Sequence, residues 1–275
     1  MEGNNKKKKR AAAFIVAVVI FILLLALCVV FVCRNVFTKP VLPESTGTVT
    51  TAAADTEATT AGSSETAQES ETVPAVPQKP ENPIDFSKQM EINNEIYAWI
   101  RIPNTNVDYP VLQSNEDDLF YLRRDLNRYY WIPGSLFTQS INSLDFSDPV
   151  TVIYGHNMTE DGTMFATLHY FEDENFFRSN EYLYIYTPGH ILTYRIISAY
   201  KYDTRHIMNS FDFKNEEVRR SYFDYVLNPM TFPMNVREGA ELKIDDKLLI
   251  LSTCMSTSAA RYLVNSVLIS DELTK

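Results

Sequence analysis

Residues Ala11 to Cys33 form a run of 23 residues without a charged side chain. At a rise of about 1.5 Å per residue, a helix of this length reaches roughly 34 Å, enough to cross a hydrocarbon core of about 30 Å. A long helix in a soluble core would show a polar face, and this run has none. The run therefore predicts a single N-terminal transmembrane helix over 11–33.

The charges beside this run predict its orientation. Lys6 to Arg10 are five consecutive basic residues before it, whereas only Arg34 and Lys39 follow closely. Basic residues stay on the cytoplasmic side of a membrane helix. We therefore expect a single-pass protein of the cell membrane, with residues 1–10 as a cytoplasmic head and the C-terminal part outside. A cleaved signal peptide is the alternative, but its apolar region would span only about 7–15 residues and end in a small-x-small site.

Residues 34–83 are expected to form an extracellular stalk. From Thr38 to Pro83 the sequence consists largely of Thr, Ser, Ala, Glu and Pro and contains no aromatic residue. Such a segment cannot bury enough apolar surface to offset the entropy lost on folding. We therefore predict disorder here and a folded domain over 84–275. A linker without any spacing role would show the same disorder.

Composition excludes several classes of function. The net charge is −10, and because a basic run lies at the extreme N-terminus, the remainder is more acidic still. A nucleic-acid-binding surface is therefore not expected. Three cysteines and four histidines do not fit a disulfide-stapled mini-domain or a Cys/His-rich zinc array. We expect neither a metal nor another cofactor.

From Ile84 onward, aromatic and β-branched residues occur in short runs bounded by Pro, Gly, Asn or Asp, which is typical of strands. The predicted strands are Ala98–Ile102, Val107–Leu112, Gly134–Phe137, Val150–Tyr154, Tyr182–Thr187, Ile191–Tyr200, Leu248–Thr253 and Tyr262–Ile269. Helices are predicted over Gln89–Tyr97 and over Asn215–Leu227, where apolar residues recur with a helical period. This pattern favours a mainly antiparallel barrel or sandwich.

One cysteine has an unusual setting. Cys28 and Cys33 lie in the predicted membrane helix, so Cys254 has no partner cysteine in the extracellular domain. A lone thiol outside the cell is either reactive or buried as a small apolar group. Because Cys254 directly follows the predicted strand Leu248–Thr253, we expect it on a rigid strand end at the rim of the sheet.

Arg261 is the nearest candidate partner of this thiol. It opens the strand that follows Cys254 after a six-residue loop. If the two strands pair as a hairpin, their facing ends lie about 5 Å apart and the guanidinium lies beside the sulfur. A neighbouring cation lowers the pKa of a thiol, and a guanidinium can also stabilise an oxyanion. An ordinary surface charge is the alternative.

His156 is the best-placed histidine. It follows the predicted strand Val150–Tyr154 after a glycine that permits close approach. An imidazole near a thiol can accept its proton and later protonate a leaving amine. His169, His190 and His206 lie in an aromatic run, a turn and a polar stretch, which favour structural or solvated roles.

The order of these residues resembles the sortases. His156 comes first, and Cys254 follows nearly a hundred positions later at the end of Leu-Ser-Thr-Cys (251–254). Arg261 then opens Arg-Tyr-Leu-Val (261–264). Several segments are similar to the class B branch: Trp99–Val111, Gly134–Phe137, Tyr154–Met158 and the predicted helix before the cysteine strand. The resemblance extends from about Asn93 to Ile269.

The resemblance implies an eight-stranded β-barrel with an N-terminal helix and a helix before the cysteine strand. It implies a membrane-anchored cysteine transpeptidase that acts on secreted proteins with a C-terminal sorting motif of the LPxTG or NPxTN kind. Cys254 would attack the carbonyl after the motif's Thr, His156 would protonate the departing amine, and Arg261 would stabilise substrate and oxyanion. An amine of a peptidoglycan cross-bridge or a protein Lys would resolve the thioester, without any metal.

The resemblance is less complete around the substrate groove. The residues expected to bind the substrate are Ser252, Thr253 and Leu122. The segment between Cys254 and Arg261 contains no acidic residue that could assist the reaction. Asp118 stands where the family often has an Asn, four residues before the Leu of Tyr-Leu (121–122).

Two other functions are alternatives to this one. A non-catalytic surface β-domain on a stalk would bind a partner or a wall polymer, and Cys254 would then be buried far from His156 and Arg261. The second is another Cys–His hydrolase. The papain-like order of Cys before His is contradicted by this sequence, and the His-Gly-Cys cluster of a peptidoglycan L,D-transpeptidase is missing.

Overall fold

The computed structural model describes residues 79–254 and 260–275, with Cys254 described by its backbone alone. The predicted cytoplasmic head, transmembrane helix and most of the stalk lie outside the described residues. Within the described residues, no helix is long and apolar enough to span a membrane. The described residues all belong to one compact unit, Thr72–Lys275.

The described chain is mainly β. Its strands are β1 (Ile96–Arg101), β2 (Asp108–Leu112), β3 (Leu136–Phe137), β4 (Val150–Tyr154), β5 (Asn157–Met158), β6 (Thr163–Met164), β7 (Tyr182–Thr187), β8 (His190–Tyr202), β9 (Met234–Val236), β10 (Leu248–Cys254) and β11 (Arg261–Leu273). Its helices are α2 (Phe86–Ile92), α3 (Glu174–Ser179), α4 (Ile207–Ser210) and α5 (Glu216–Leu227), with 3-10 helices η1 (Phe120–Arg123) and η2 (Ala166–Glu172).

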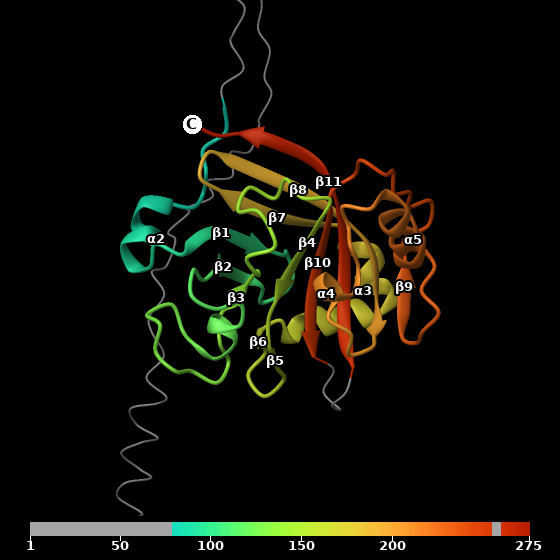
Figure 1. The fold of residues 1–275 in the computed structure, drawn as a ribbon, viewed down its shortest axis with the longest axis horizontal. Coiled ribbons are helices and arrows are strands. Elements are labelled where there is room, and N and C mark those ends of the chain that lie inside the picture. Colours follow the sequence, from blue (N-terminus) through green and yellow to red (C-terminus); the bar gives the residue numbers. More distant parts are fainter. Residues whose placement is uncertain (1–78, 255–259) are drawn as a thin grey trace, which may run out of the picture. The chain divides into compact units, whose positions relative to one another are not determined.

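Eight of these strands close into a barrel (Figure 1). Hydrogen bonds connect them in the order β11-β10-β4-β3-β2-β1-β7-β8, and β11 also pairs with β8, which closes the ring. The short β9 pairs with β8 beyond the end of β7. The eight-stranded barrel is thus confirmed. Two pairings are parallel, β10 with β4 and β2 with β3, so the barrel is less uniformly antiparallel than predicted.

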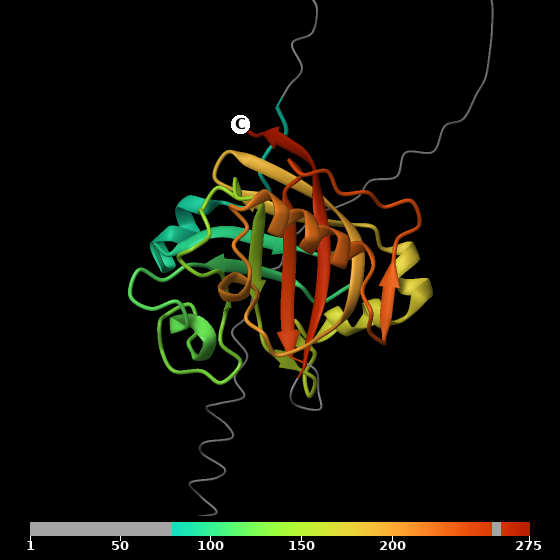
Figure 2. The same cartoon turned by 45° about the vertical axis from the view of Figure 1, so that its right-hand side comes forward.

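Two apolar clusters lie on the two faces of β10. Leu249 and Leu251 belong to the cluster that fills the barrel. Leu248 and Ile250 belong to a second cluster, together with buried side chains of α5. Figure 2 shows α5 lying across β10 and β11 on the outside of the barrel. Alternate residues of a strand face opposite sides, so one apolar run supplies both clusters.

The N-terminal helix is shorter than predicted. The carboxylate of Asp85 caps α2 by accepting the N–H of Lys88, and the helix ends at Ile92 with Asn93 as its C-cap. The side-chain oxygen of Asn93 then accepts the N–H of Glu95 (2.9 Å), which turns the chain out of the helix. Tyr97, which was expected to end the helix, instead lies within β1, so this boundary was wrong.

The helix before the cysteine strand is confirmed as α5, with Asn215 as its N-cap. In contrast, η2 and α3 were not predicted from the sequence. Leu168 and Phe171, both fully buried in η2, are three residues apart. This spacing suits a 3-10 helix rather than the 3.6-residue period by which α-helices are found.

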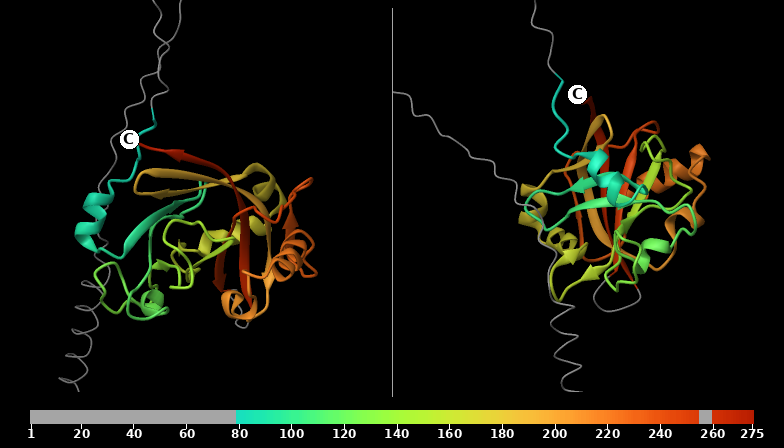
Figure 3. Two further views of the ribbon diagram at one scale, coloured as in Figure 1. Left: turned by 45° about the horizontal axis from the view of Figure 1, so that its top comes forward. Right: turned by 90° about the vertical axis from the view of Figure 1, so that its left-hand side faces the viewer.

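The described chain begins and ends at one end of the barrel (Figure 3), which we call the termini end. The carbonyl of Pro80 accepts the N–H of Lys275, and the Asn82 amide donates to the carbonyl of Thr187 (2.8 Å). Thr187 precedes the two-residue turn between β7 and β8, where Gly189 has a φ of +86°. The opposite end, where β10 finishes, is called the Cys254 end.

Candidate active site

Three strand ends lie side by side at the Cys254 end. β10 runs parallel to β4, with Ser252 opposite Tyr154. β10 also runs antiparallel to β11, with Cys254 opposite Arg261. His156 lies two residues beyond Tyr154, as Cys254 lies two residues beyond Ser252. The backbone therefore places the predicted histidine and arginine on the chains that flank the cysteine strand.

His156 is held by hydrogen bonds of its backbone and its ring. Its carbonyl accepts the N–H of Phe165 (2.9 Å), and ring atom Nε2 lies 2.7 Å from the carbonyl oxygen of Leu122. A carbonyl can only accept, so Nε2 carries a proton and donates it. Proton exchange by this imidazole would therefore use the other ring nitrogen, Nδ1.

Gly155 is required by the close packing beneath His156. A Cβ atom at this position would lie 2.4 Å from Leu136 Cδ2 and 2.7 Å from Phe165 Cδ2. The N–H of Gly155 also donates to the carbonyl of Ser252 (3.1 Å), which extends the pairing between the chains of β4 and β10. The close packing and the hydrogen bond of Gly155 therefore fix the backbone position of His156, the next residue.

Arg261 is exposed, and its charge acts on two half-buried neighbours. Burial raises the pKa of the Tyr154 hydroxyl, and the nearby Arg261 guanidinium opposes this rise. Burial also lowers the pKa of His206, Arg261 lowers it further, and Asp118 opposes the change. The rings of His206 and Tyr154 stack with their centroids 5.6 Å apart. Tyr154 and His206 therefore lie near the guanidinium of Arg261.

His206 was not predicted to belong here. Tyr202, the last residue of β8, is opposite Arg261, so the chain leaving β8 passes directly beside the guanidinium. Ring atom Nδ1 of His206 accepts the N–H of Asn209 (3.3 Å) at the start of α4. The polar sequence around His206 gives no sign of this position, because it depends on the pairing of β8 with β11.

The predicted substrate-binding residues lie in different places. Thr253 is 1% exposed and shares the inward face of β10 with Leu251, whereas Ser252 is 5% exposed and lies on the outward face. The hydroxyl of Thr253 has no hydrogen-bond partner among the described residues. Leu122 is half-buried, and its carbonyl binds the imidazole of His156. Thr253 therefore faces the barrel interior, whereas Ser252, although also buried, lies on the opposite face of β10.

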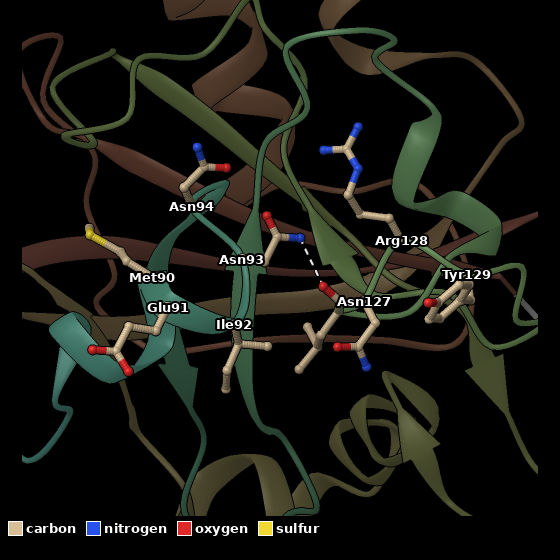
Figure 4. Close-up of a pocket in the computed structure, with 9 residues that line it drawn as sticks. Met90, Glu91, Ile92, Asn93, Asn94, Asn127, Arg128 and Tyr129 are labelled. Atoms are coloured by element: carbon tan, nitrogen blue, oxygen red, sulfur yellow. Dashed lines mark hydrogen bonds between the residues drawn. The ribbon is translucent and has the colours of Figure 1, made fainter.

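Two surface pockets lie away from these residues. One, of about 420 Å³, is lined by residues of α2 and of the loop after η1, including Met90, Asn127 and Tyr129 (Figure 4). Within it, the Asn93 amide donates to the carbonyl of Leu126 (2.9 Å). The other, of about 470 Å³, lies at the termini end. Neither is lined by any predicted site residue.

The sequence matches the Sortase domain family over residues 100–269. This match covers more than half of the chain and includes β4 and most of β11, the two strands that flank the cysteine strand. Together with the closed eight-stranded barrel, it shows that the chain belongs to the sortase family.

Named relatives point to one branch of this family. The chain is 30% identical over 166 residues to Sortase B of Listeria monocytogenes, covering 60% of this chain and 64% of the relative. It is 28% identical to Sortase B of Staphylococcus aureus, covering 62% of this chain and 67% of the relative. The chain thus spans less than two thirds of the length of the Listeria protein.

Solved structures give the same grouping. The structure of Clostridium perfringens sortase B superposes with a TM-score of 0.60 at 32% identity, covering 67% of this chain and 100% of that chain. A Staphylococcus aureus sortase B–substrate complex gives a TM-score of 0.61 at 25% identity, covering 69% of this chain and 87% of that chain. The chain is therefore similar to sortase B proteins in both sequence and fold.

Proposed function

We propose that this chain is a cysteine transpeptidase that cleaves a C-terminal sorting motif of secreted proteins after its Thr and joins the new end to an amine of the cell envelope. The observation that carries this proposal is the strand register at the Cys254 end. Cys254 is opposite Arg261 and lies on the strand that pairs with β4, which leads to His156. Membership of the sortase family supports an enzyme of this class.

The first half-reaction forms a thioester. The Cys254 thiolate attacks the carbonyl carbon after the motif's Thr, and the carbonyl electron pair moves to oxygen. Collapse of this adduct breaks the C–N bond, and His156 gives a proton to the leaving amine. Because Nε2 of His156 donates to Leu122, we assign the proton transfer to Nδ1.

The second half-reaction transfers the acyl group. An incoming amine attacks the thioester carbon and gives its proton to the imidazole of His156, while Cys254 leaves as the thiolate. The amine would come from a peptidoglycan cross-bridge or from a protein Lys. A sortase B complexed with Gly3 is among the related structures, which supports a short peptide as a laboratory acceptor.

Arg261 has the chemistry to stabilise the oxygen that becomes negative in both steps. Its guanidinium donates several hydrogen bonds and keeps its charge. Ser252, on the outward face of β10, and Leu122, in η1, would contact the sorting motif. Thr253, on the inward face, would hold the end of β10 in place rather than touch the substrate.

The topology is part of the proposal. Residues 11–33 would span the cell membrane, with residues 1–10 in the cytoplasm and residues 34–83 as a stalk. The uncharged run and its basic N-terminal flank support this orientation. It places the active site outside the cell, where secreted substrates and wall amines are both present.

The test uses the full chain in detergent with peptides that carry LPxTG-type or NPxTN-type motifs and triglycine as acceptor. Mass spectrometry should detect the cleaved peptide, the joined product and an acyl-enzyme at Cys254 in the wild type. Cys254→Ala should give none of the three, whereas His190→Ala, at the termini end, should give all of them. Joining of peptide to triglycine by Cys254→Ala would disprove the mechanism.

A further inference from the structure

A second histidine lies close behind the proposed catalytic residues. Ring atom Nδ1 of His169 lies 2.6 Å from Oε1 of Glu172, and Nε2 lies 3.0 Å from Nδ2 of Asn157. An amide nitrogen can only donate, so Nε2 accepts and the ring proton sits on Nδ1, facing the carboxylate. Both ring nitrogens of His169 thus have a fixed role, one as donor and one as acceptor.

The ring of His169 is also packed against the sheet. It stacks on the ring of Tyr262, with the centroids 4.8 Å apart and the planes 29° apart. Tyr262 is fully buried in the cluster that fills the barrel, and η2, which carries His169, contacts β11. His169 therefore lies on the inward face of the sheet, whereas Ser252 and the cluster beneath α5 mark the outward face.

The partners of His169 are the chain neighbours of the proposed catalytic residues. Asn157 directly follows His156, and Tyr262 directly follows Arg261. The strands that lead to these residues are not adjacent, because β10 lies between β4 and β11. His169 consequently connects the His156 segment to the Arg261 segment behind the end of the cysteine strand.

We propose that His169 is a positioning residue for the transpeptidation reaction: by binding Asn157 and packing on Tyr262, it holds His156 and Arg261 at a fixed separation on either side of Cys254. Glu172 orients the ring by accepting its Nδ1 proton, as carboxylates orient functional histidines elsewhere. The proposal rests on the proposed roles of His156 and Arg261. A misplacement of reacting groups by about 1 Å can slow an enzyme about 100-fold.

The hydrogen bonds separate this role from simple packing. A side chain needed only to cover Tyr262 would have to supply an aromatic ring, and Phe would serve as well as His. The two hydrogen bonds of the ring add what Phe lacks, namely a fixed link from η2 to the residue after His156. His169→Phe keeps the ring and removes both bonds, so it tests the link rather than the packing.

The experiment compares variants of the full chain in the peptide-to-triglycine assay. His169→Phe should lower kcat about 10- to 100-fold, with the KM for the peptide changed less than about twofold. Asn157→Ala should lower kcat by a similar factor, and the double variant should lose no more than His169→Phe alone. His190→Phe is the matched control, because His190 also pairs with a carboxylate, Asp271 (2.7 Å), but at the termini end. It should retain the wild-type kcat.

Wild-type kcat in His169→Phe would overturn the proposal, as would fully additive losses in the double variant. If His169→Phe does not fold, Glu172→Gln decides the question, because it preserves the size of the side chain while weakening the bond to Nδ1. An unchanged kcat in Glu172→Gln then counts against the proposal. If His169→Phe is fully active and Cys254→Ala is inactive, only the proposed role of His169 is disproved. If Cys254→Ala is active, the proposed function itself is disproved.

Discussion

The barrel has a histidine–carboxylate pair at each end, in different surroundings. At the termini end, His190 and Asp271 lie 2.7 Å apart, and their side chains are 39% and 47% exposed. At the Cys254 end, His169 lies 2.6 Å from Glu172 and is 20% exposed. The first pair joins the β7–β8 turn to the end of β11, beside the chain termini. The second lies behind three converging strand ends.

A histidine–carboxylate pair therefore does not by itself mark a functional site. The Cys254 end differs because three adjacent strands, which come from distant parts of the sequence, bring His156, Cys254 and Arg261 close together along the sheet edge. The parallel pairing of β10 with β4 and the antiparallel pairing of β10 with β11 produce this arrangement. At the termini end, the same strands carry turns and chain ends instead.

Among substitutions that test this difference between the two ends, we expect the largest loss of activity at Arg261. Arg261→Ala should reduce kcat/KM for a sorting peptide by about 100- to 1000-fold, because it removes the donors proposed for the developing oxyanion. Arg261→Lys should recover only part of this loss, since an ammonium keeps the charge without the planar fork of donors. The measurement is steady-state transpeptidation with triglycine.

Arg101→Ala is the matched control, because Arg101 is also an exposed arginine at a strand terminus, 3.9 Å from Asp108. It should leave kcat/KM close to the wild-type value. Equal losses in the Arg101 and Arg261 variants would mean that surface charge in general, rather than a local role of Arg261, controls the reaction.

Two glycines, Gly155 at the Cys254 end and Gly189 at the termini end, test the same comparison through substitutions that affect the backbone. Gly155→Ala should cost about 1–3 kcal/mol of unfolding free energy, because the added methyl group overlaps Leu136 and Phe165. It should also lower kcat, since His156 follows directly. Gly189→Ala meets no atom within 4 Å but has a φ of +86°, so we expect a loss of about 1–2 kcal/mol without a change in kcat. Urea unfolding and the peptide assay measure both; equal kcat values in the two variants would contradict the prediction.

The local elements of the fold were largely predictable from the sequence. Val150–Tyr154 and Tyr182–Thr187 were predicted with their observed bounds, because runs of β-branched and aromatic residues end there at Pro, Gly or Asn. Tyr97 was misplaced because the turn after α2 depends on a side-chain bond of Asn93, which periodicity does not show. The parallel pairing of β4 with β10 joins segments far apart in sequence, so no local pattern encodes it.

The site was predictable to the extent that it resembles a known family. The expected hairpin predicts Arg261 beside Cys254, and the backbone register agrees with this position. The catalytic roles of His156, Cys254 and Arg261 come from the resemblance. The aromatic run around His169 and the polar stretch around His206 favour structural or solvated roles. Their positions follow from the pairing of β8 with β11 and from the packing of η2 against β11, which are tertiary features.

A smaller effect is expected in the pH dependence of stability. Burial lowers the pKa of His206 in the folded protein, and the Arg261 charge adds to this, whereas an unfolded imidazole titrates near about 6.5. Between the two pKa values the unfolded state binds more protons. The contribution of His206 is therefore complete above about pH 6.5 and is lost as the pH falls through the lower, folded pKa.

His206→Gln should flatten this part of the stability curve. Urea midpoints of the wild type and the variant, measured from about pH 5 to about pH 7.5, give the difference directly. The two curves should run parallel above about pH 6.5, and the wild type should lose more stability than the variant as the pH falls below this value. An identical slope in both proteins would show that His206 does not link protons to folding.

The smallest effect is expected at the exposed pair of the termini end. Asp271→Asn removes the charge that faces His190, and because both side chains are well exposed, the loss of unfolding free energy should be below about 1 kcal/mol and should shrink with added salt. The kcat of the variant should equal that of the wild type, whereas Glu172→Gln, the same chemical change at the other end, should lower it. A comparable fall of kcat in both variants would mean that the two ends are mechanically coupled along β11. The pair at the termini end would then also contribute to activity.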